Sequence, residues 1–303
     1  MTQTSEWLAG ARPRTLPAAV APVAVGTAAA AWQGSLNLGY AVLCLIVALA
    51  LQVGVNYAND YSDGVRGTDQ ERVGPVRLVG QGLASPAAVK RAAFAMFSIA
   101  AVAGLLLTAL SGHWLFIAVG ALAIVSAWFY TGGTRPYGYA GLGELFVFVW
   151  FGLAAVLGTV YSQTAQLTSF DFLLAVASGA FSCALLVINN LRDREGDEVV
   201  GKRTLAVRLG DARTRAFYVL LAWTAPTASI AVAGFAVGDA EGWPYLAVIG
   251  ALGGAWVSRP VFRVRRGAVG PQLITALGET TRAQLLWAAL TVAGIALQKW
   301  LQG

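Results

Sequence analysis

More than half of the acidic residues of this sequence lie in two short windows, residues 56–71 and 189–204. In the first window, Asn56 and Asp60 are four residues apart, and Asp60 and Asp63 are three apart. Side chains with these spacings share one face of an α-helix. The first window therefore predicts a helix end that carries an amide and two carboxylates on one face.

The second window repeats this pattern. Asn189 precedes Asp193 by four residues, and Asp197 follows Asp193 by the same interval. Each window comes at the end of a long apolar stretch, the second and the sixth of the chain, so the two helices should run in the same direction. We therefore expect the two clusters to face each other across a helix bundle, and the pairing suggests an internal duplication of about four helices.

Carboxylates gathered at a membrane boundary need a compensating cation. A charged side chain inside a bilayer costs about 2.5–3.5 kcal/mol, and like charges placed together cost more. Mg²⁺ commonly binds through one or two carboxylates together with substrate phosphate oxygens. Four basic residues near the clusters are suited to hold the same phosphates: Arg77, Arg135, Lys202 and Arg203. Carboxylates, Mg²⁺ and basic side chains together indicate a diphosphate-binding site.

The alternative is that these acids are ordinary charged residues of solvated loops. We prefer that interpretation for the acids outside the spaced pattern, namely Glu6, Glu71, Glu195, Glu198, Asp211 and Glu279. For Asp60, Asp63, Asp193 and Asp197, the matched spacing favours the metal site.

The composition shows which elements must position these residues. Of the 303 residues, 57% are hydrophobic and 12% are charged, whereas soluble domains carry about 25% charge. This excludes a disordered chain, a coiled coil and a disulfide-rich secreted scaffold. Continuous apolar stretches predict membrane-spanning helices, because the strands of a membrane barrel alternate over about ten residues. We predict an all-α polytopic membrane protein that forms one domain over residues 1–303. The nine expected transmembrane helices are 16–33, 38–60, 88–111, 113–131, 143–162, 171–191, 214–237, 243–259 and 283–302.

The basic residues predict the orientation of these helices. With the N-terminus on the cytoplasmic side, all of the 21 Lys and Arg residues except Lys299 lie on that side, as the positive-inside rule requires. The C-terminus is then outside, and both acidic windows are cytoplasmic. We expect a multi-pass protein of the cell membrane whose basic face attracts anionic lipid of the bilayer. Nucleic-acid binding is not expected, because no basic stretch lies in a soluble module of its own.

The first apolar stretch allows a second interpretation. Arg12 and Arg14, followed by an apolar run and the three alanines at 28–30, are also compatible with a cleaved signal peptide. Pro17 and Pro22 favour an irregular first helix that is retained.

The two acidic windows resemble the motifs of a known family. Asn59-Asp60-Tyr-Ser-Asp63 resembles the N-D-x-x-D motif of the UbiA superfamily of intramembrane prenyltransferases, and residues 193–197 resemble its D-x-x-x-D motif. The further aspartate that the superfamily places four residues after the first motif is absent, and Asp69 is the candidate substitute.

Other segments resemble the branch of this superfamily that prenylates 1,4-dihydroxy-2-naphthoate in menaquinone synthesis. They are residues 74–78, 130–139, 141–144 and 201–207. Many members of that branch have a lysine four residues after the tyrosine of the middle loop. Thr134 occupies that position here, and Arg135 is the candidate replacement.

The resemblance implies a nine-helix bundle around a central cavity, with aspartates at its cytoplasmic mouth and an apolar chamber below. It implies Mg²⁺-dependent transfer of a polyprenyl group from polyprenyl diphosphate to 1,4-dihydroxy-2-naphthoate, with loss of CO₂ and diphosphate, giving demethylmenaquinone. The expected metal ligands are Asp60, Asp63, Asp193 and Asp197, which form the catalytic set together with Lys202. The expected substrate-binding residues are Asn56, Asn59, Asp69, Arg77, Tyr130, Arg135, Tyr139, Asn189, Asn190 and Arg203. The only histidine, His113, is expected on the opposite side of the membrane, so histidine catalysis is not expected.

Two alternatives remain at this point. One is a prenyltransferase of the same superfamily with another acceptor, such as 4-hydroxybenzoate or a haem or chlorophyll precursor. The other is a cation-coupled secondary transporter, in which intramembrane acids bind the coupling ion. The position of the acids at one membrane face, beside basic residues, favours the enzyme.

Overall fold

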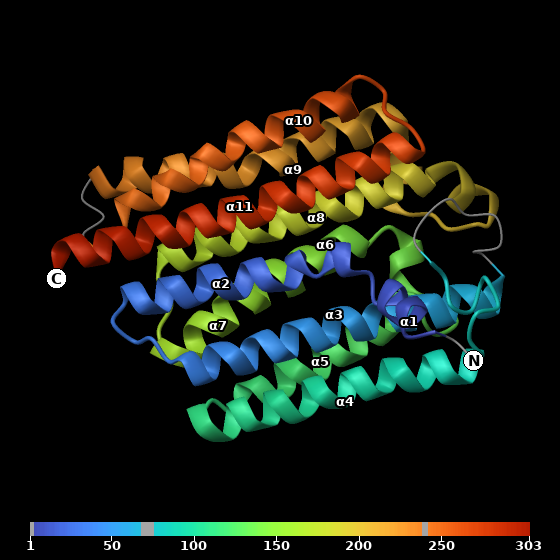
Figure 1. Ribbon diagram of the computed structural model, residues 1–303, viewed down its shortest axis with the longest axis horizontal. Helices are drawn as coiled ribbons and strands as arrows, with labels where there is room; N and C mark the ends of the chain where they lie inside the picture. The colour runs from blue at the N-terminus through green and yellow to red at the C-terminus, as the bar shows by residue number, and fades with distance from the viewer. Residues whose placement is uncertain (1–2, 68–75, 238–241) are drawn as a thin grey trace.

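The computed structural model describes residues 3–67, 76–237 and 242–303, and the regular elements in these ranges are all helical. Most of the helices run roughly side by side along the long axis of the molecule, and the two ends of the chain lie at opposite ends of the bundle (Figure 1). In chain order the elements are α1 (Thr4–Gly10), η1 (Pro13–Thr15), α2 (Pro17–Trp32), α3 (Leu38–Arg66), α4 (Pro86–Ser111), α5 (Leu115–Phe129), η2 (Tyr137–Ala140), α6 (Gly143–Val147), η3 (Phe148–Ala154), α7 (Ala155–Thr164), α8 (Ser169–Val199), α9 (Leu205–Val237), η4 (Tyr245–Gly253), α10 (Gly254–Arg265) and α11 (Pro271–Gln302).

Each of the nine predicted segments coincides with helical structure, which confirms the all-α class. By length and composition, the described residues contain six helices able to cross a membrane, or seven if α1, η1 and α2 are counted as one span bent by 51°. α5 is shorter, and α11 lies outside this set. The buried face of α11 carries polar side chains, including Gln284, Thr291 and Gln298. Nine membrane crossings therefore stay a prediction.

The outer helices present apolar side chains away from the protein, as a lipid-facing surface requires. On α4 and α5 the large exposed hydrophobic residues include Val102, Leu106, Leu110, Leu115, Leu122 and Val125. α8 is the central helix, because 78% of its apolar window is buried, against 28% for α3. Small residues allow this close packing. A Cβ atom on Gly152 of η3 would lie 2.7 Å from the Cα atom of Gly179 in α8.

The two helices that carry the acidic windows have well-defined ends. α3 begins where the Asn37 side chain accepts a hydrogen bond from the Tyr40 N–H (3.1 Å), and it ends at Gly67, whose φ of 72° is left-handed. α8 begins with a capping box in which Thr168 and Asp171 bond each other's backbone N–H groups. α8 continues through Gly196 to Val199, so the predicted i,i+4 pairing of Asp193 and Asp197 is helical.

Candidate active site

A cavity of about 980 Å³ opens between the helices, and its wall combines a polar end with an apolar remainder. The polar end includes Asn59, Asp63, Arg77, Asn189, Asn190, Arg192, Asp193, Asp197 and Lys202. The apolar wall includes Val47, Ala48, Leu51, Ala101, Leu105, Phe116 and Phe151. The volume lies at the upper end of the range for small-molecule sites, about 300–1,000 Å³. The two acidic windows therefore meet at one cavity, as their spacing predicted.

Asp63 of α3 is bonded to groups from two other segments of the chain. The Lys202 Nζ atom lies 3.1 Å from the Asp63 Oδ1 atom, and both side chains are about 95% buried. The Tyr139 hydroxyl donates a hydrogen bond to the same carboxylate. The Lys202 ammonium group also lies 4.7 Å from the centre of the Tyr139 ring. Asp63 thus faces a cation and an aromatic ring at the cavity wall.

Arg66 holds the loop that supplies Tyr139. Its guanidinium donates to the backbone carbonyls of Thr131 and Gly133 and lies 5.4 Å from the centre of the Tyr139 ring. The loop from α5 to α6 is therefore tied to the end of α3, which explains why Tyr139 reaches Asp63.

Asp193 of α8 is paired with its neighbour in sequence. Arg192 donates from Nε to Asp193 Oδ1 (2.8 Å) and from a terminal nitrogen to Oδ2 (2.7 Å). Asp197 lies one turn further along the same helix, and both aspartates are buried on the cavity wall. Protein cations thus compensate carboxylates at this end of the cavity, as buried charges require.

Asp60 has a different environment from the other three aspartates. Its two oxygens accept hydrogen bonds from the backbone N–H groups of Leu78 (2.7 Å) and Val79 (3.1 Å). Its side chain is buried and is not part of the cavity wall. Asp60 thereby fixes the segment that places Arg77 on the wall. Its role as a metal ligand stays a prediction.

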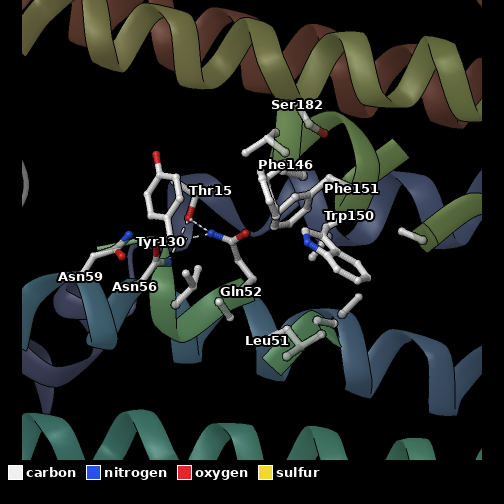
Figure 2. Close-up of a pocket in the computed structure, with 18 of the residues that line it drawn as sticks. Thr15, Leu51, Gln52, Asn56, Asn59, Tyr130, Phe146, Trp150, Phe151 and Ser182 are labelled. Carbon is white, nitrogen blue, oxygen red and sulfur yellow. Dashed lines mark hydrogen bonds between the residues drawn. The ribbon is translucent and has the colours of Figure 1, made fainter. Parts of the chain in front are cut away.

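The asparagines line the cavity, and each is oriented by a neighbour. Asn59 accepts a hydrogen bond from the Thr131 hydroxyl (2.8 Å), and Asn190 donates to the Glu144 Oε1 atom (2.9 Å). Asn189 donates to the backbone carbonyl of its own helix one turn earlier, at 3.1 Å. The two amide hydrogens of Asn56 are used by the Ala11 carbonyl (2.9 Å) and the Thr15 hydroxyl (3.1 Å), as Figure 2 shows in part.

The structure separates the remaining predicted residues. Tyr130 lines the cavity with Tyr139, but Arg135 and Arg203 are exposed and do not line it. Asp69 lies outside the described residues. The roles assigned to these three charged residues stay predictions.

Tyr137 supports the wall near Tyr130. Its ring stacks on Phe146 with centroids 4.0 Å apart, and its hydroxyl donates to the Ser126 carbonyl (2.8 Å). Burial raises the pKa of the Tyr137 phenol, so the hydroxyl keeps the proton that it donates.

The donor set at the polar end fits Mg²⁺ shared with a phosphate ligand. Among the described residues, no three His, Cys, Asp or Glu side chains are close enough to enclose a metal ion by themselves. Mg²⁺ usually takes one or two carboxylates and completes its shell with water and substrate phosphates. Carboxylates from α3 and α8 that line a single cavity provide such a partial shell.

Several polar residues of the cavity wall were not predicted from the sequence, among them Gln52, Trp150 and Arg192. Arg192 was counted only as a marker of membrane orientation, although its place beside Asp193 was a usable signal. Gln52 precedes Asn56 by four residues and so continues the polar face of α3 by one turn. Trp150 lies in the π-helix η3, which no simple periodicity predicts.

This architecture, with buried carboxylates and cations at one end of a mostly apolar chamber, is that of an intramembrane enzyme acting on an amphiphilic diphosphate. The chain belongs to the UbiA prenyltransferase family, whose sequence profile matches residues 19–274.

Curated relatives match nearly the whole chain. It is 52% identical over 297 residues to a 1,4-dihydroxy-2-naphthoate octaprenyltransferase of Mycobacterium tuberculosis. The alignment covers 97% of each of the two chains. It is 37% identical to the protein of the same name from Escherichia coli, covering 99% of this chain and 98% of the relative.

Solved structures share the fold. A UbiA homolog from Archaeoglobus fulgidus bound to GPP and Mg²⁺ superposes with a TM-score of 0.65 at 15% identity, covering 96% of this chain and 99% of the other. The apo UbiA homolog from Aeropyrum pernix gives 0.61 at 16% identity, covering 94% and 97%.

Proposed function

We propose that this protein transfers a polyprenyl group from polyprenyl diphosphate to 1,4-dihydroxy-2-naphthoate, releasing diphosphate and CO₂ and forming demethylmenaquinol, the reduced form of demethylmenaquinone. The observation that carries the proposal is the meeting of Asp63, Asp193, Asp197 and Lys202 at the polar end of one mostly apolar cavity. The names of relatives that match 97% or more of the chain support this choice of acceptor.

The polar end would hold the diphosphate. Asp63, Asp193 and Asp197 would hold Mg²⁺, with Asp60 as a further predicted ligand, and the bound metal would act as a Lewis acid on the leaving group. Lys202 and Arg192 now neutralise aspartates. With the metal bound they would become available to donate hydrogen bonds to the diphosphate oxygens. Donors fixed in a buried site stabilise developing negative charge without reorganising.

The bond changes balance without a protein base. The allylic C–O bond of the polyprenyl diphosphate breaks, and its electron pair leaves with the diphosphate. A ring carbon forms the new C–C bond, and the carboxyl group on that carbon leaves as CO₂, returning an electron pair to the ring. This agrees with the position of His113, which packs against Tyr161 with centroids 4.7 Å apart and does not line the cavity.

The wall would protect the allylic cation from water and steer it. Tyr130 and Phe146 line the cavity, and the faces of aromatic rings attract cations. Exclusion of water from the chamber prevents hydrolysis of the reactive group. Arg77 on the same wall is our candidate for binding the naphthoate carboxylate, because a guanidinium matches a carboxylate in two parallel hydrogen bonds.

A turnover assay tests the proposal. The purified protein, in lipid nanodiscs with Mg²⁺ and polyprenyl diphosphates of several chain lengths, should convert dihydroxynaphthoate to demethylmenaquinol. The product is detected by mass spectrometry after air oxidation to demethylmenaquinone. Chelation of Mg²⁺ should stop the reaction, and 4-hydroxybenzoate should be a poor acceptor. A protein that prenylates 4-hydroxybenzoate but not dihydroxynaphthoate would contradict the proposed acceptor.

We further propose that the protein lies in the cell membrane with its N-terminus and the polar end of the cavity on the cytoplasmic side. The distribution of basic residues supports this orientation. Both native cysteines are buried, so cysteines introduced at exposed Ser5 and Gln302 can be labelled selectively. An impermeant maleimide should label Gln302→Cys in intact cells and Ser5→Cys only after permeabilisation. The reverse labelling pattern would refute the orientation.

A further inference from the structure

On α3, one helical turn before Asn56, the cavity wall carries the side-chain amide of Gln52, which the proposed diphosphate site does not use. Gln52 is 6% exposed and lines the cavity. It precedes Asp63 by eleven residues, which corresponds to about 16 Å along the axis of α3. A hydrocarbon chain offers no hydrogen-bond partner, so a glutamine at this depth would be costly if the cavity bound only the prenyl group.

The hydrogen bonds around Thr15 determine which way the Gln52 amide points. The Thr15 hydroxyl donates its only hydrogen to the Arg12 carbonyl (2.9 Å). The two amides that contact Thr15 must therefore donate to it, Gln52 through Nε2 (3.0 Å) and Asn56 through Nδ2 (3.1 Å). Gln52 Nε2 also lies 3.4 Å from Asn56 Oδ1. The amide nitrogen of Gln52 is thus fixed toward Thr15.

The oxygen of Gln52 is left as an acceptor on the cavity side. Within the described part of the chain, no N–H or O–H group donates a hydrogen bond to this oxygen. Figure 2 shows it directed away from Thr15, toward the space in front of Trp150. The indole nitrogen of Trp150 is buried without a hydrogen-bond partner. An acceptor from α3 and an unsatisfied donor from η3 therefore lie in the wall of the same cavity.

The helix that carries Trp150 is itself unusual. Residues Phe148–Ala154 form a π-helix, a rare geometry that is frequent at functional sites. The extra residue in its turn changes which side chains face inward, and Trp150 and Phe151 both line the cavity. Phe146, just before it, adds another aromatic ring to the wall. These rings suit a flat aromatic ligand better than a flexible isoprenoid.

We infer that Gln52 and Trp150 bind the ring of the aromatic acceptor, with the Gln52 oxygen accepting a hydrogen bond from its 4-hydroxyl group. The same hydroxyl oxygen accepts from the Trp150 indole N–H. The distance of about 16 Å along α3 between Asp63 and Gln52 leaves room for the metal-bound diphosphate, then the allylic carbon, then the bicyclic ring. The carboxylate of the acceptor then faces Arg77 at the mouth. This inference rests on the proposed function for the identity of the acceptor.

Equilibrium binding tests the inference independently of turnover. The probes are 1,4-dihydroxy-2-naphthoate and 1-hydroxy-2-naphthoate, which lacks only the 4-hydroxyl, titrated calorimetrically into the full chain in nanodiscs. One hydrogen bond corresponds to about tenfold in affinity. The parent protein should bind the dihydroxy compound about tenfold more tightly. Gln52→Met should lose most of this preference and keep only the part that Trp150 supplies. Leu43→Met, a change to the same residue type on α3 at a position outside the cavity wall, should keep the parent's preference.

Two further measurements keep the result decisive. Binding of geranylgeranyl diphosphate with Mg²⁺ should be unchanged in each variant, which shows that the site is folded. Trp150→Phe keeps an aromatic ring but removes the indole N–H, and it should reduce the preference for the dihydroxy compound about threefold to tenfold. If Gln52→Met does not fold, this variant alone tests whether the wall recognises the 4-hydroxyl group.

The outcomes separate this inference from the proposed function. A full tenfold preference that survives in both Gln52→Met and Trp150→Phe overturns the inference, even if the parent turns over dihydroxynaphthoate. A preference that depends on Gln52, in a protein that gives no product, supports the binding site and overturns the proposed reaction. A parent protein that binds neither naphthoate overturns both.

Discussion

Lys202 and Asp63 form a buried ion pair at the polar end of the cavity, with Nζ and Oδ1 3.1 Å apart. Asp63 comes from the end of α3, and Lys202 lies in the loop between α8 and α9. The pair joins the two halves of the predicted duplication, and neither partner can be removed without leaving the other charge buried. A ligand that brings both a metal cation and a phosphate can replace the pair, since it offers Asp63 a cation and Lys202 an anion.

Lys202→Gln should therefore reduce kcat far more than Arg203→Gln. Removal of one fixed donor to a developing anion costs about 100-fold to 1,000-fold in kcat, whereas Arg203 is exposed and away from the cavity wall. Steady-state kinetics with saturating Mg²⁺ measures the difference. Equal losses in the two variants would show that Arg203 moves onto the diphosphate and that the ion pair has no special role.

Asp60 and Asp63 should be distinguishable, although we expect turnover to need both. Asp60→Asn can no longer accept from both the Leu78 and Val79 N–H groups, and one unsatisfied buried donor costs about 1–3 kcal/mol. We expect faster hydrogen exchange in residues 76–80 for Asp60→Asn and a much higher Mg²⁺ requirement for Asp63→Asn. If Asp60→Asn instead raises the Mg²⁺ requirement with no change in exchange, Asp60 binds the metal directly.

Glu144 should act by positioning Asn190. Its Oε1 atom accepts from the Asn190 amide (2.9 Å), and its Oε2 atom is buried without a hydrogen-bond partner. Glu144→Gln keeps an acceptor for that amide, whereas Glu144→Ala leaves it unsatisfied. We expect Glu144→Ala to raise KM for the prenyl diphosphate about tenfold and Glu144→Gln to remain close to the parent. A large, equal loss in both variants would indicate that the carboxylate charge itself is required.

Much of the fold could be predicted because hydrophobic length is a strong local signal. The segment predicted at 38–60 is α3. The helix extends beyond the predicted end to Arg66, and its last two turns carry the buried Asp60 and Asp63. The start of α11 was missed by contrast. Residues 271–282 carry polar side chains such as Thr280 and Thr281 that face the protein interior, so hydropathy gives no signal there.

The site could be predicted only where one helix determines it. The i,i+4 spacing of Asp193 and Asp197 places both on the cavity without further information. The orientation of the Asp60 carboxylate depends on its hydrogen bond from the Leu78 N–H, which comes from another segment of the chain. The role proposed for Gln52 depends on Thr15 and Trp150, which also come from distant segments. Such convergence requires the tertiary structure, because no local periodicity encodes it.

The π-helix that presents Trp150 should depend on the contact between Gly152 and Gly179. A Cβ atom at Gly152 would lie 2.7 Å from the Ala175 carbonyl oxygen and 2.7 Å from Gly179 Cα, and backbone atoms cannot move aside as a side-chain end can. Gly152→Ala should therefore destabilise the protein by about 1–3 kcal/mol, as overpacking does, and should weaken binding of the aromatic acceptor by displacing η3. The matched control is Gly158→Ala in the same span, where an added Cβ meets no atom within 4 Å and should gain up to about 1 kcal/mol of helix propensity. Thermal unfolding in detergent, followed with and without dihydroxynaphthoate, compares the two variants. If Gly152→Ala unfolds at the parent's temperature and binds the acceptor normally, close packing of η3 on α8 does not hold Trp150 in place.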